Sequence, residues 1–203
     1  MIKIIFSGFG GQGVLTLGQI VATIAMNKGK EVTWMPSYGA EMRGGTANCS
    51  VIISDSVIGS PIITSDADIL CAMNNPSVDK FLPIIRPGGI VMINSSIIAV
   101  KVPRDDVTVI DIDATNIAVH VGSPKYQNMV MLAGFLKATD LFTLADIETV
   151  LEQKFMNKDP KLITLNMEAI KQGIGVGHLM TTHEAFVVRE SLKRLCRSRL
   201  SRM

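Results

Sequence analysis

The sequence has few cysteines and few histidines, and neither set is arranged like a metal or cluster site. Its 203 residues contain three of each, and the cysteines (Cys49, Cys71 and Cys196) form no CxxC pair. An iron–sulfur cluster needs about four thiolates, so we expect that this chain holds none by itself. A disulfide framework is equally unsupported. The histidines lack the HExxH spacing, and we expect no metal site.

Long hydrophobic runs are also absent. No apolar stretch reaches the roughly 18 residues that a membrane-spanning helix requires. The apolar run before the first glycine turn, residues 2–6, is only five residues long, which is too short for the apolar core of a signal peptide. We therefore expect a cytoplasmic protein with no membrane partner.

A large net charge is lacking as well, because the formal charge at pH 7 is only +2. The charge is nevertheless uneven: residues 189–203 carry +5, and the rest of the chain carries −3. A basic tail can attract nucleic acid or an acidic protein face. Cations also suit a solvated helix C-terminus, and we favour that interpretation, so no nucleic-acid partner is expected.

What is present is the composition and pattern of a globular α/β protein, with 47% hydrophobic and 19% charged residues. Strand-like and helix-like segments alternate up to about residue 113, and helical patterns follow. This order predicts a three-layer α/β/α sandwich with a mostly parallel sheet and a Rossmann-like first βαβ unit. We expect one α/β domain over residues 1–177 and a C-terminal basic helix or tail over 178–203.

The expected elements follow from apolar periodicity and turn residues. Pro36 is expected to close the second strand, and Arg86-Pro87-Gly88-Gly89 to form a turn. Residues 57–63 are either a further strand or an irregular edge. The expected strands are 2–6, 31–35, 46–53, 68–73, 89–94 and 107–111. The expected helices are 12–28, 77–85, 126–139, 143–155, 161–173 and 181–200.

The first candidate site is the segment Gly8-Phe9-Gly10-Gly11-Gln12-Gly13, which fits the pattern G-x-G-x-x-G. It lies directly after an expected strand and opens an expected helix. In that setting glycines permit a tight turn and the close approach of a ligand, and the N–H groups at the helix start favour an anion. The sequence therefore predicts a phosphate or diphosphate site, and a purely structural turn is the alternative.

A classical dinucleotide site needs, in addition, an acid at the end of the second strand to bind the ribose. That strand ends at residues 35–38, which contain no acid. Glu31 stands at the start of the strand, and Glu41 lies several residues beyond its end. We therefore do not favour binding of a nicotinamide dinucleotide.

The second candidate site is the stretch 36–46, PSYGAEMRGGT. It follows the second strand, so in a parallel sheet it lies at the same edge as the glycine loop. An arginine there can bind a phosphate or carboxylate with two parallel hydrogen bonds. The alternative is an exposed loop in which Glu41 and Arg43 pair weakly. The candidate residues are Ser37, Tyr38, Arg43, Gly44, Gly45 and Thr46.

Weaker candidates are Asn94-Ser95-Ser96 and Asn74-Asn75, for which helix capping is the favoured role. The sequence contains no GxSxG elbow, no paired cysteine and histidine and no GxxxxGK[ST] loop. We therefore assign no catalytic residue, and the pattern favours a binding domain that lends part of a site.

Four segments together resemble a known family: GFGGQGVLTLGQ, MPSYGAEMRGGTANCSVIIS, IGSP and AMNNPSVDKFLP. They resemble the gamma subunits of 2-oxoacid:ferredoxin oxidoreductases, which include the pyruvate/ketoisovalerate enzymes. The 2-oxoglutarate and branched-chain 2-oxoacid members are the most similar. The resemblance spans roughly residues 1–175 and does not extend to the tail.

The resemblance implies oxidative decarboxylation of a 2-oxo acid to an acyl-CoA, with the electrons passed to ferredoxin. It implies thiamine diphosphate, iron–sulfur clusters and coenzyme A in the assembled complex, and none bound by this chain alone. The implied partners are alpha and beta (thiamine-binding) subunits, a ferredoxin-like subunit and, through the complex, ferredoxin. The isolated chain is expected to be inactive and to expose an apolar contact surface that permits self-association.

The same resemblance implies roles for the two candidate segments. Gly8, Gly10, Gly11, Gln12 and Gly13 face a coenzyme A phosphate or a subunit junction, and residues 37, 38 and 43–46 form the neighbouring wall. Two alternatives stay open: a stand-alone nucleotide- or flavin-binding oxidoreductase, and a purely structural subunit. The sequence does not identify the 2-oxo acid.

Overall fold

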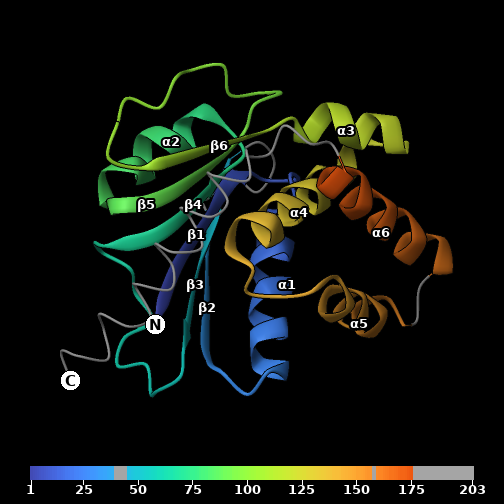
Figure 1. The fold of residues 1–203 in the computed structure, drawn as a ribbon, viewed down its shortest axis with the longest axis horizontal. Helices are drawn as coiled ribbons and strands as arrows, with labels where there is room; N and C mark the ends of the chain where they lie inside the picture. The colour runs from blue at the N-terminus through green and yellow to red at the C-terminus, as the bar shows by residue number, and fades with distance from the viewer. Residues whose placement is uncertain (39–44, 157–158, 176–203) are drawn as a thin grey trace.

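The computed structural model describes residues 1–38, 45–156 and 159–175. Within these ranges six strands form one sheet in the order β2-β3-β1-β4-β5-β6 (Figure 1). β4, β5 and β6 continue from β1 in parallel, whereas β3 is antiparallel to both β1 and β2. Five strands therefore run in one direction and β3 runs in the other. The strands are β1 Ile2–Phe9, β2 Glu31–Tyr38, β3 Thr46–Ser54, β4 Ala67–Ala72, β5 Ile85–Asn94 and β6 Thr108–Ile112.

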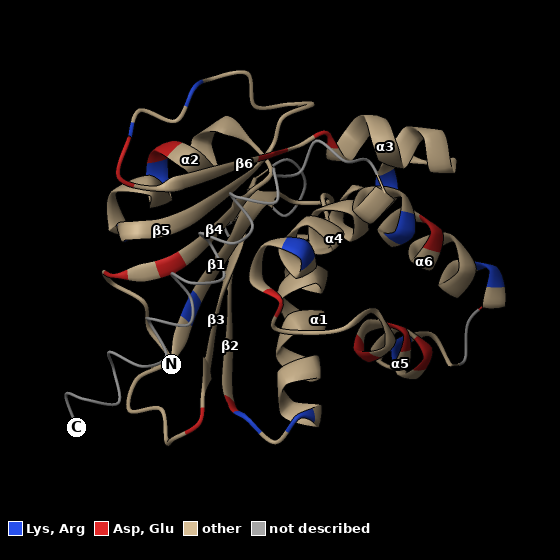
Figure 2. Ribbon diagram, in the orientation of Figure 1, with Lys and Arg blue, Asp and Glu red and all other residues tan. Residues whose placement is uncertain are grey.

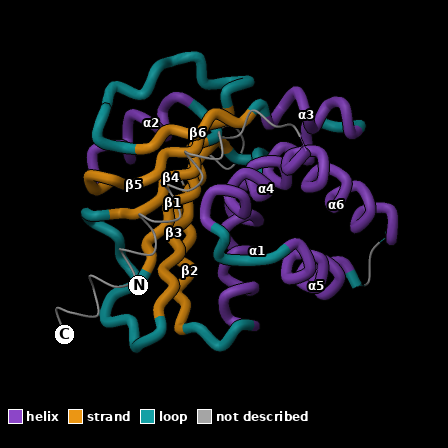
Figure 3. Tube along the Cα trace, viewed as in Figure 1, coloured by secondary structure: helices purple, strands orange, loops and turns teal. Residues whose placement is uncertain are grey.

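Helices cover both faces of the sheet (Figure 3). One buried cluster joins the sheet to α1, α3, α4, α5 and α6, and a second cluster joins the opposite face to α2. The predicted three-layer α/β/α sandwich is therefore confirmed. The helices are α1 Val14–Asn27, α2 Asn75–Phe81, α3 Ala114–Val121, α4 Gln127–Thr139, α5 Leu144–Phe155 and α6 Pro160–Gly175, and two short 3-10 turns are η1 Leu82–Ile84 and η2 Pro124–Tyr126.

The central strands are covered on both faces, which explains their continuous apolar sequence. In β1, Ile4, Ile5 and Phe6 are all buried, and every residue of β4 is buried. Strands enclosed by helices on both sides have no solvent face, so the alternation of polar and apolar residues disappears. Phe6 meets Phe135 of α4 with ring centroids 6.0 Å apart, which connects the sheet to the larger helical layer.

The first strand–helix–strand unit differs from the expectation in one respect. β1, α1 and β2 follow one another, and β1 and β2 run in the same direction, but β3 pairs between them. The connection from β2 to β3 is short, and a short connection permits only an antiparallel neighbour, because a parallel crossover needs a dozen or more residues.

Two expectations about prolines were wrong. Pro36 does not close β2 but lies inside it, paired with Cys49. β2 is an edge strand, where the missing N–H of a proline is tolerated. The expected turn at residues 86–89 lies within β5, whose register against β4 shifts at this point, and Gly88 has a φ of 72°.

The remaining elements agree with the sequence apart from two segments. Residues 57–63 form no strand, which leaves the irregular-edge interpretation. Helix α3 was not predicted. Thr143 caps α5 in a capping box with Asp146, as its position before the helix indicated. The expected helix over 181–200 lies outside the described residues, so the proposed division at residue 177 stays a prediction.

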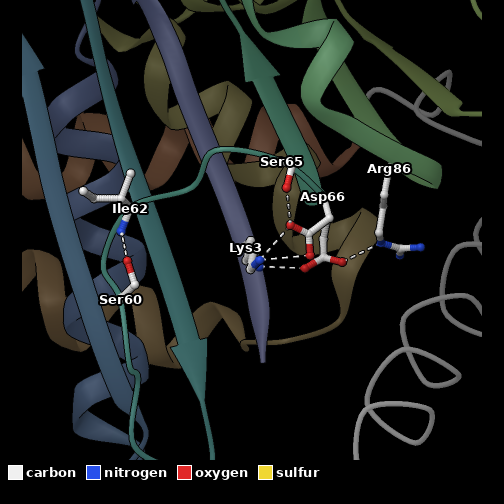
Figure 4. Close-up of polar contacts among 7 residues, drawn as sticks. Lys3, Ser60, Ile62, Ser65, Asp66 and Arg86 are labelled. Carbon is white, nitrogen blue, oxygen red and sulfur yellow. Dashed lines mark hydrogen bonds and ion pairs between the residues drawn. The ribbon is translucent and has the colours of Figure 1, made fainter. Parts of the chain in front are cut away.

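The N-terminal ends of the parallel strands are held by ion pairs (Figure 4). Lys3 of β1 binds Asp66 at 2.9 Å, and its backbone N–H donates to Asp68 of β4 at 2.7 Å. Asp68 is buried and also accepts from Nε of Arg86 at 2.6 Å. A buried carboxylate needs such partners, so the N-terminal ends of these strands have a structural role. The glycine loop lies at the opposite, C-terminal end of β1.

Candidate functional site

The glycine loop, residues 8–13, connects the C-terminal end of β1 to α1, as predicted. The side chain of Gln12 fixes its shape. Its Oε1 accepts from the N–H of Phe9 at 2.6 Å, and its Nε2 donates to the carbonyl of Met73 at 3.0 Å. Gln12 therefore braces the loop against the end of β4, which is a positioning role within the protein.

Three of the four glycines in the loop, Gly8, Gly11 and Gly13, have different physical roles. A Cβ at Gly8 would lie 2.9 Å from Val14 and 3.0 Å from the Cβ of Met73, so this position is packed against protein. Gly11 has a φ of 94° and nothing within 4 Å of the position of a Cβ. Gly13 has a φ of 78° and lies against Asn128 of α4. Gly11 thus adjoins open space, and both Gly11 and Gly13 need the left-handed region that other residues rarely adopt.

The N–H groups of the loop divide into those used internally and those left over. Phe9 donates to Gln12, Gly10 donates to the carbonyl of Gly45 at 2.9 Å, and Gln12 donates to the carbonyl of Phe9. Within the part of the chain that the structure describes, the N–H groups of Gly11 and Gly13 have no acceptor. These two donors are available for an anion.

Helix α1 adds a positive end to the loop. Gly13 is its N-cap, no side chain caps it, and its first turn has no acidic residue. Figure 2 shows that no charged residue lies along the helix. The first N–H groups of a helix have no partner within it, and their dipoles give the N-terminus a partial positive charge. The loop and the helix start together can bind a phosphate or carboxylate.

The second candidate segment meets the glycine loop directly, which confirms that the two share an edge. Gly8 of β1 and Tyr38 of β2 both pair with Ala47, on opposite sides of β3. The hydrogen bond from Gly10 to Gly45 joins the segments. Ser37 and Thr46 are exposed at this edge. The side chain of Tyr38, together with Arg43 and Gly44, lies outside the described residues.

Two of the weaker candidates are helix caps. Asn74 caps α2, because its Oδ1 accepts from the N–H of Ser77 at 2.9 Å. Ser96 accepts from the N–H of Thr115 at the start of α3 at 3.0 Å. The capping role favoured from the sequence is confirmed for Asn74 and Ser96, whereas Asn94 is buried and donates to the side chains of Thr115 and Gln127.

Sequence reasoning missed Asn128, which contacts the loop from α4. Its Nδ2 donates to the carbonyl of Gly13 at 3.3 Å across 115 positions of the sequence. The helical pattern of residues 126–139 was clear, but nothing local in that pattern shows which loop the start of the helix touches.

The described residues hold no group of three or more His, Cys, Asp or Glu side chains that could bind a metal. Cys49 and Cys71 are both free thiols and buried. Burial raises the pKa of Cys49 to about 12 and raises that of Cys71 as well, so neither is a reactive thiolate. In the described part of the chain, none of the helices is both long and apolar enough to cross a membrane.

Residues 3–176 match the family described as "Pyruvate ferredoxin/flavodoxin oxidoreductase". The chain is 34% identical over 174 residues to ketoisovalerate oxidoreductase subunit VorA of Methanothermobacter marburgensis, covering 85% of this chain but 36% of that protein. It is 34% identical over 149 residues to 2-oxoglutarate synthase subunit KorC of Methanocaldococcus jannaschii, covering 72% of this chain and 79% of KorC.

A solved structure has the same fold. The keto/oxoacid ferredoxin oxidoreductase gamma subunit from Geobacter sulfurreducens superimposes with a TM-score of 0.72 at 28% identity, covering 86% of this chain and 96% of that one. The chain spans about a third of the VorA protein and most of KorC and the Geobacter subunit. The family match and these relatives confirm the resemblance to gamma subunits seen in the sequence, and the chain belongs to the pyruvate ferredoxin/flavodoxin oxidoreductase family.

Proposed function

We propose that this chain is the gamma subunit of a cytoplasmic complex that converts a 2-oxo acid and coenzyme A to an acyl-CoA and carbon dioxide while reducing ferredoxin. Family membership supports the proposal, as do relatives named for ketoisovalerate and 2-oxoglutarate. In this complex the alpha, beta and ferredoxin-like partners supply the thiamine diphosphate and the iron–sulfur clusters. The chain alone is then inactive, and purified chain that turns over a 2-oxo acid by itself would refute this.

Partner subunits require contact surfaces, and exposed apolar side chains occur in separate parts of the described chain. Val57 in the connection between β3 and β4 is 84% exposed, and Met156 after α5 is 76% exposed. Stable interfaces bury about 1,200–2,000 Å² in total. A pull-down of the tagged full chain from native cells should recover a subunit that binds thiamine diphosphate. If no such subunit is recovered, the result counts against the partner assignment.

Within the complex, we propose that the glycine loop binds a phosphate of coenzyme A. The observation that carries this proposal is Gly11: its N–H has no acceptor among the described residues, and open space lies beside it next to the uncapped start of α1. The N-terminus of a helix that follows a strand commonly binds phosphate, because its free N–H groups and its dipole favour an anion. Arg43 of the second candidate segment is proposed to add a forked donor that lysine cannot copy.

The test compares two glycines whose backbone φ is positive. Gly11 and Gly29 both have positive φ, 94° and 72°, and neither would bring a Cβ within 4 Å of another atom. Only Gly11 lies in the loop, because Gly29 follows the other end of α1. Gly11→Val should raise the KM for coenzyme A about tenfold or more in the assembled complex, and Gly29→Val should leave it within about twofold.

Arg43→Lys gives a second measurement. A charge-assisted hydrogen bond contributes about 1.5–3 kcal/mol, which corresponds to a loss on the order of tenfold or more in apparent affinity. Unchanged coenzyme A dependence in both the Gly11 and Arg43 variants would leave only the structural-turn interpretation. Assembly that fails for Gly11→Val but succeeds for Gly29→Val would place the loop in a subunit interface.

A further inference from the structure

The first turn of α4 packs against the glycine loop at Gly13. Asn128, the second residue of α4, is buried, and its Nδ2 donates to the carbonyl of Gly13 at 3.3 Å. A Cβ at Gly13 would overlap this amide and would lie 2.8 Å from its Cγ. Asn128 therefore occupies the space in which a side chain at position 13 would lie.

This contact orients the first peptide of α1. The Gly13 carbonyl accepts from Asn128 and, at 3.0 Å, from the N–H of Leu17. The carbonyl of Gly13 and the N–H of Val14 belong to one planar trans peptide, so they point in opposite directions. Because the carbonyl is held by Leu17 and Asn128, the Val14 N–H points away from α1 at its N-terminal end, where we propose that the phosphate binds.

The same contact brings two positive helix ends together. α1 begins at Val14 and α4 begins at Gln127, and neither helix has an acidic residue in its first turn or a side-chain cap. A carboxylate at such a place stabilises a helix, because it compensates the dipole. Asn128 has the shape of aspartate but no charge, so it leaves both ends uncompensated.

We propose that Asn128 is a positioning residue for the anion site, which orients the Gly13–Val14 peptide and whose neutrality preserves the positive potential that a phosphate needs. This inference rests on the proposed function, in which the phosphate belongs to coenzyme A. It predicts that a negative charge at position 128 acts against the ligand, in addition to removing the hydrogen bond to the Gly13 carbonyl.

The test is Asn128→Asp in the reconstituted complex. The KM for coenzyme A should rise about tenfold or more at low ionic strength, with most of the loss in KM and little in kcat. The ratio of variant to wild-type KM should shrink between about 0.01 M and about 1 M salt, over which the Debye length falls from about 30 Å to about 3 Å. The thermal midpoint should fall, as in Asn128→Ala, because a carboxylate cannot donate to the Gly13 carbonyl.

Two further variants separate charge from shape. Asn128→Ala removes the hydrogen bond without adding charge, and it should raise the KM a few-fold at every salt concentration. Gln19→Glu adds the same charge to α1 well away from the loop, next to Lys154, which already donates to Gln19. This control should leave the KM within about twofold.

The outcomes distinguish this inference from the proposed function. If Gly11→Val raises the KM but Asn128→Asp does not, the role of Asn128 is overturned and the loop site stands. If neither variant changes the KM, the loop site itself is overturned. A KM ratio that is the same at all salt concentrations would show a purely structural effect and would also overturn the inference. If the Asn128→Asp complex does not assemble, Asn128→Ala becomes the deciding variant. An unchanged KM for coenzyme A in Asn128→Ala would then overturn the inference.

Discussion

Helix α1 approaches the sheet through Gly18, and alanine at this position should destabilise the protein although it favours the helix. A Cβ on Gly18 would overlap Sγ of Cys49, and it would lie 3.2 Å from the Phe6 ring and 3.4 Å from Nε1 of Trp34. Cys49 and Phe6 are fully buried in β3 and β1, so neither can move aside. α1 must therefore shift away from the sheet.

The magnitude follows from two opposing terms. Overpacking a well-packed core costs about 1–3 kcal/mol, and the overlap with a buried sulfur places Gly18→Ala toward the upper end. Replacing a helical glycine by alanine raises the free energy of unfolding by about 1 kcal/mol, because alanine favours the helix. We expect a net loss of about 1–2 kcal/mol in the free energy of unfolding, measured by urea denaturation of the full chain.

A double-mutant cycle tests the cause. Cys49→Ala removes the sulfur, so Gly18→Ala should be much less destabilising in that background, with a coupling energy of about 1–2 kcal/mol. A Gly18→Ala protein that is more stable than the wild type would refute the close packing of α1. Because α1 carries the glycine loop at its start, the same shift should also weaken the use of coenzyme A.

Two further predictions concern titratable groups. The hydrogen bond from Lys28 holds the pKa of Asp146 below its usual value, so the ionised form stabilises the fold above about pH 4, and that stability is lost as the pH falls through the lowered pKa. Urea unfolding between about pH 5 and pH 3 should show a weaker pH dependence in Asp146→Asn, and identical slopes would contradict this. Cys49 and Cys71 are buried thiols, so in a Cys196→Ser protein at about pH 8 a thiol reagent should react only on unfolding, and rapid labelling of the native protein would contradict their burial.

The glycine loop could be predicted because its signals are local. An apolar run, glycines at fixed spacing and a helical pattern after Gly13 define a strand, a turn and a helix without reference to the rest of the chain. The shared edge of the two candidate segments was also predicted, because β1 and β2 run in the same direction. The two segments do not contact each other through neighbouring β1 and β2. They meet through the start of β3, which lies between the C-terminal ends of β1 and β2.

What could not be predicted depends on pairing between distant segments. The place of β3 in the sheet was missed because strand order is not encoded in periodicity. Pro36 was expected to end β2, although an edge strand accepts proline. The contact of Asn128 with Gly13 joins residues 115 positions apart, and only the packing of α4 against α1 creates it.

The central claim is that this chain contributes the coenzyme A phosphate site of a larger enzyme. Its most direct test is equilibrium binding of coenzyme A to the assembled complex without a 2-oxo acid, comparing wild type with Gly11→Val. The account predicts about tenfold weaker binding in the variant, with Gly29→Val equal to wild type. Equal affinity in all three complexes would contradict the claim.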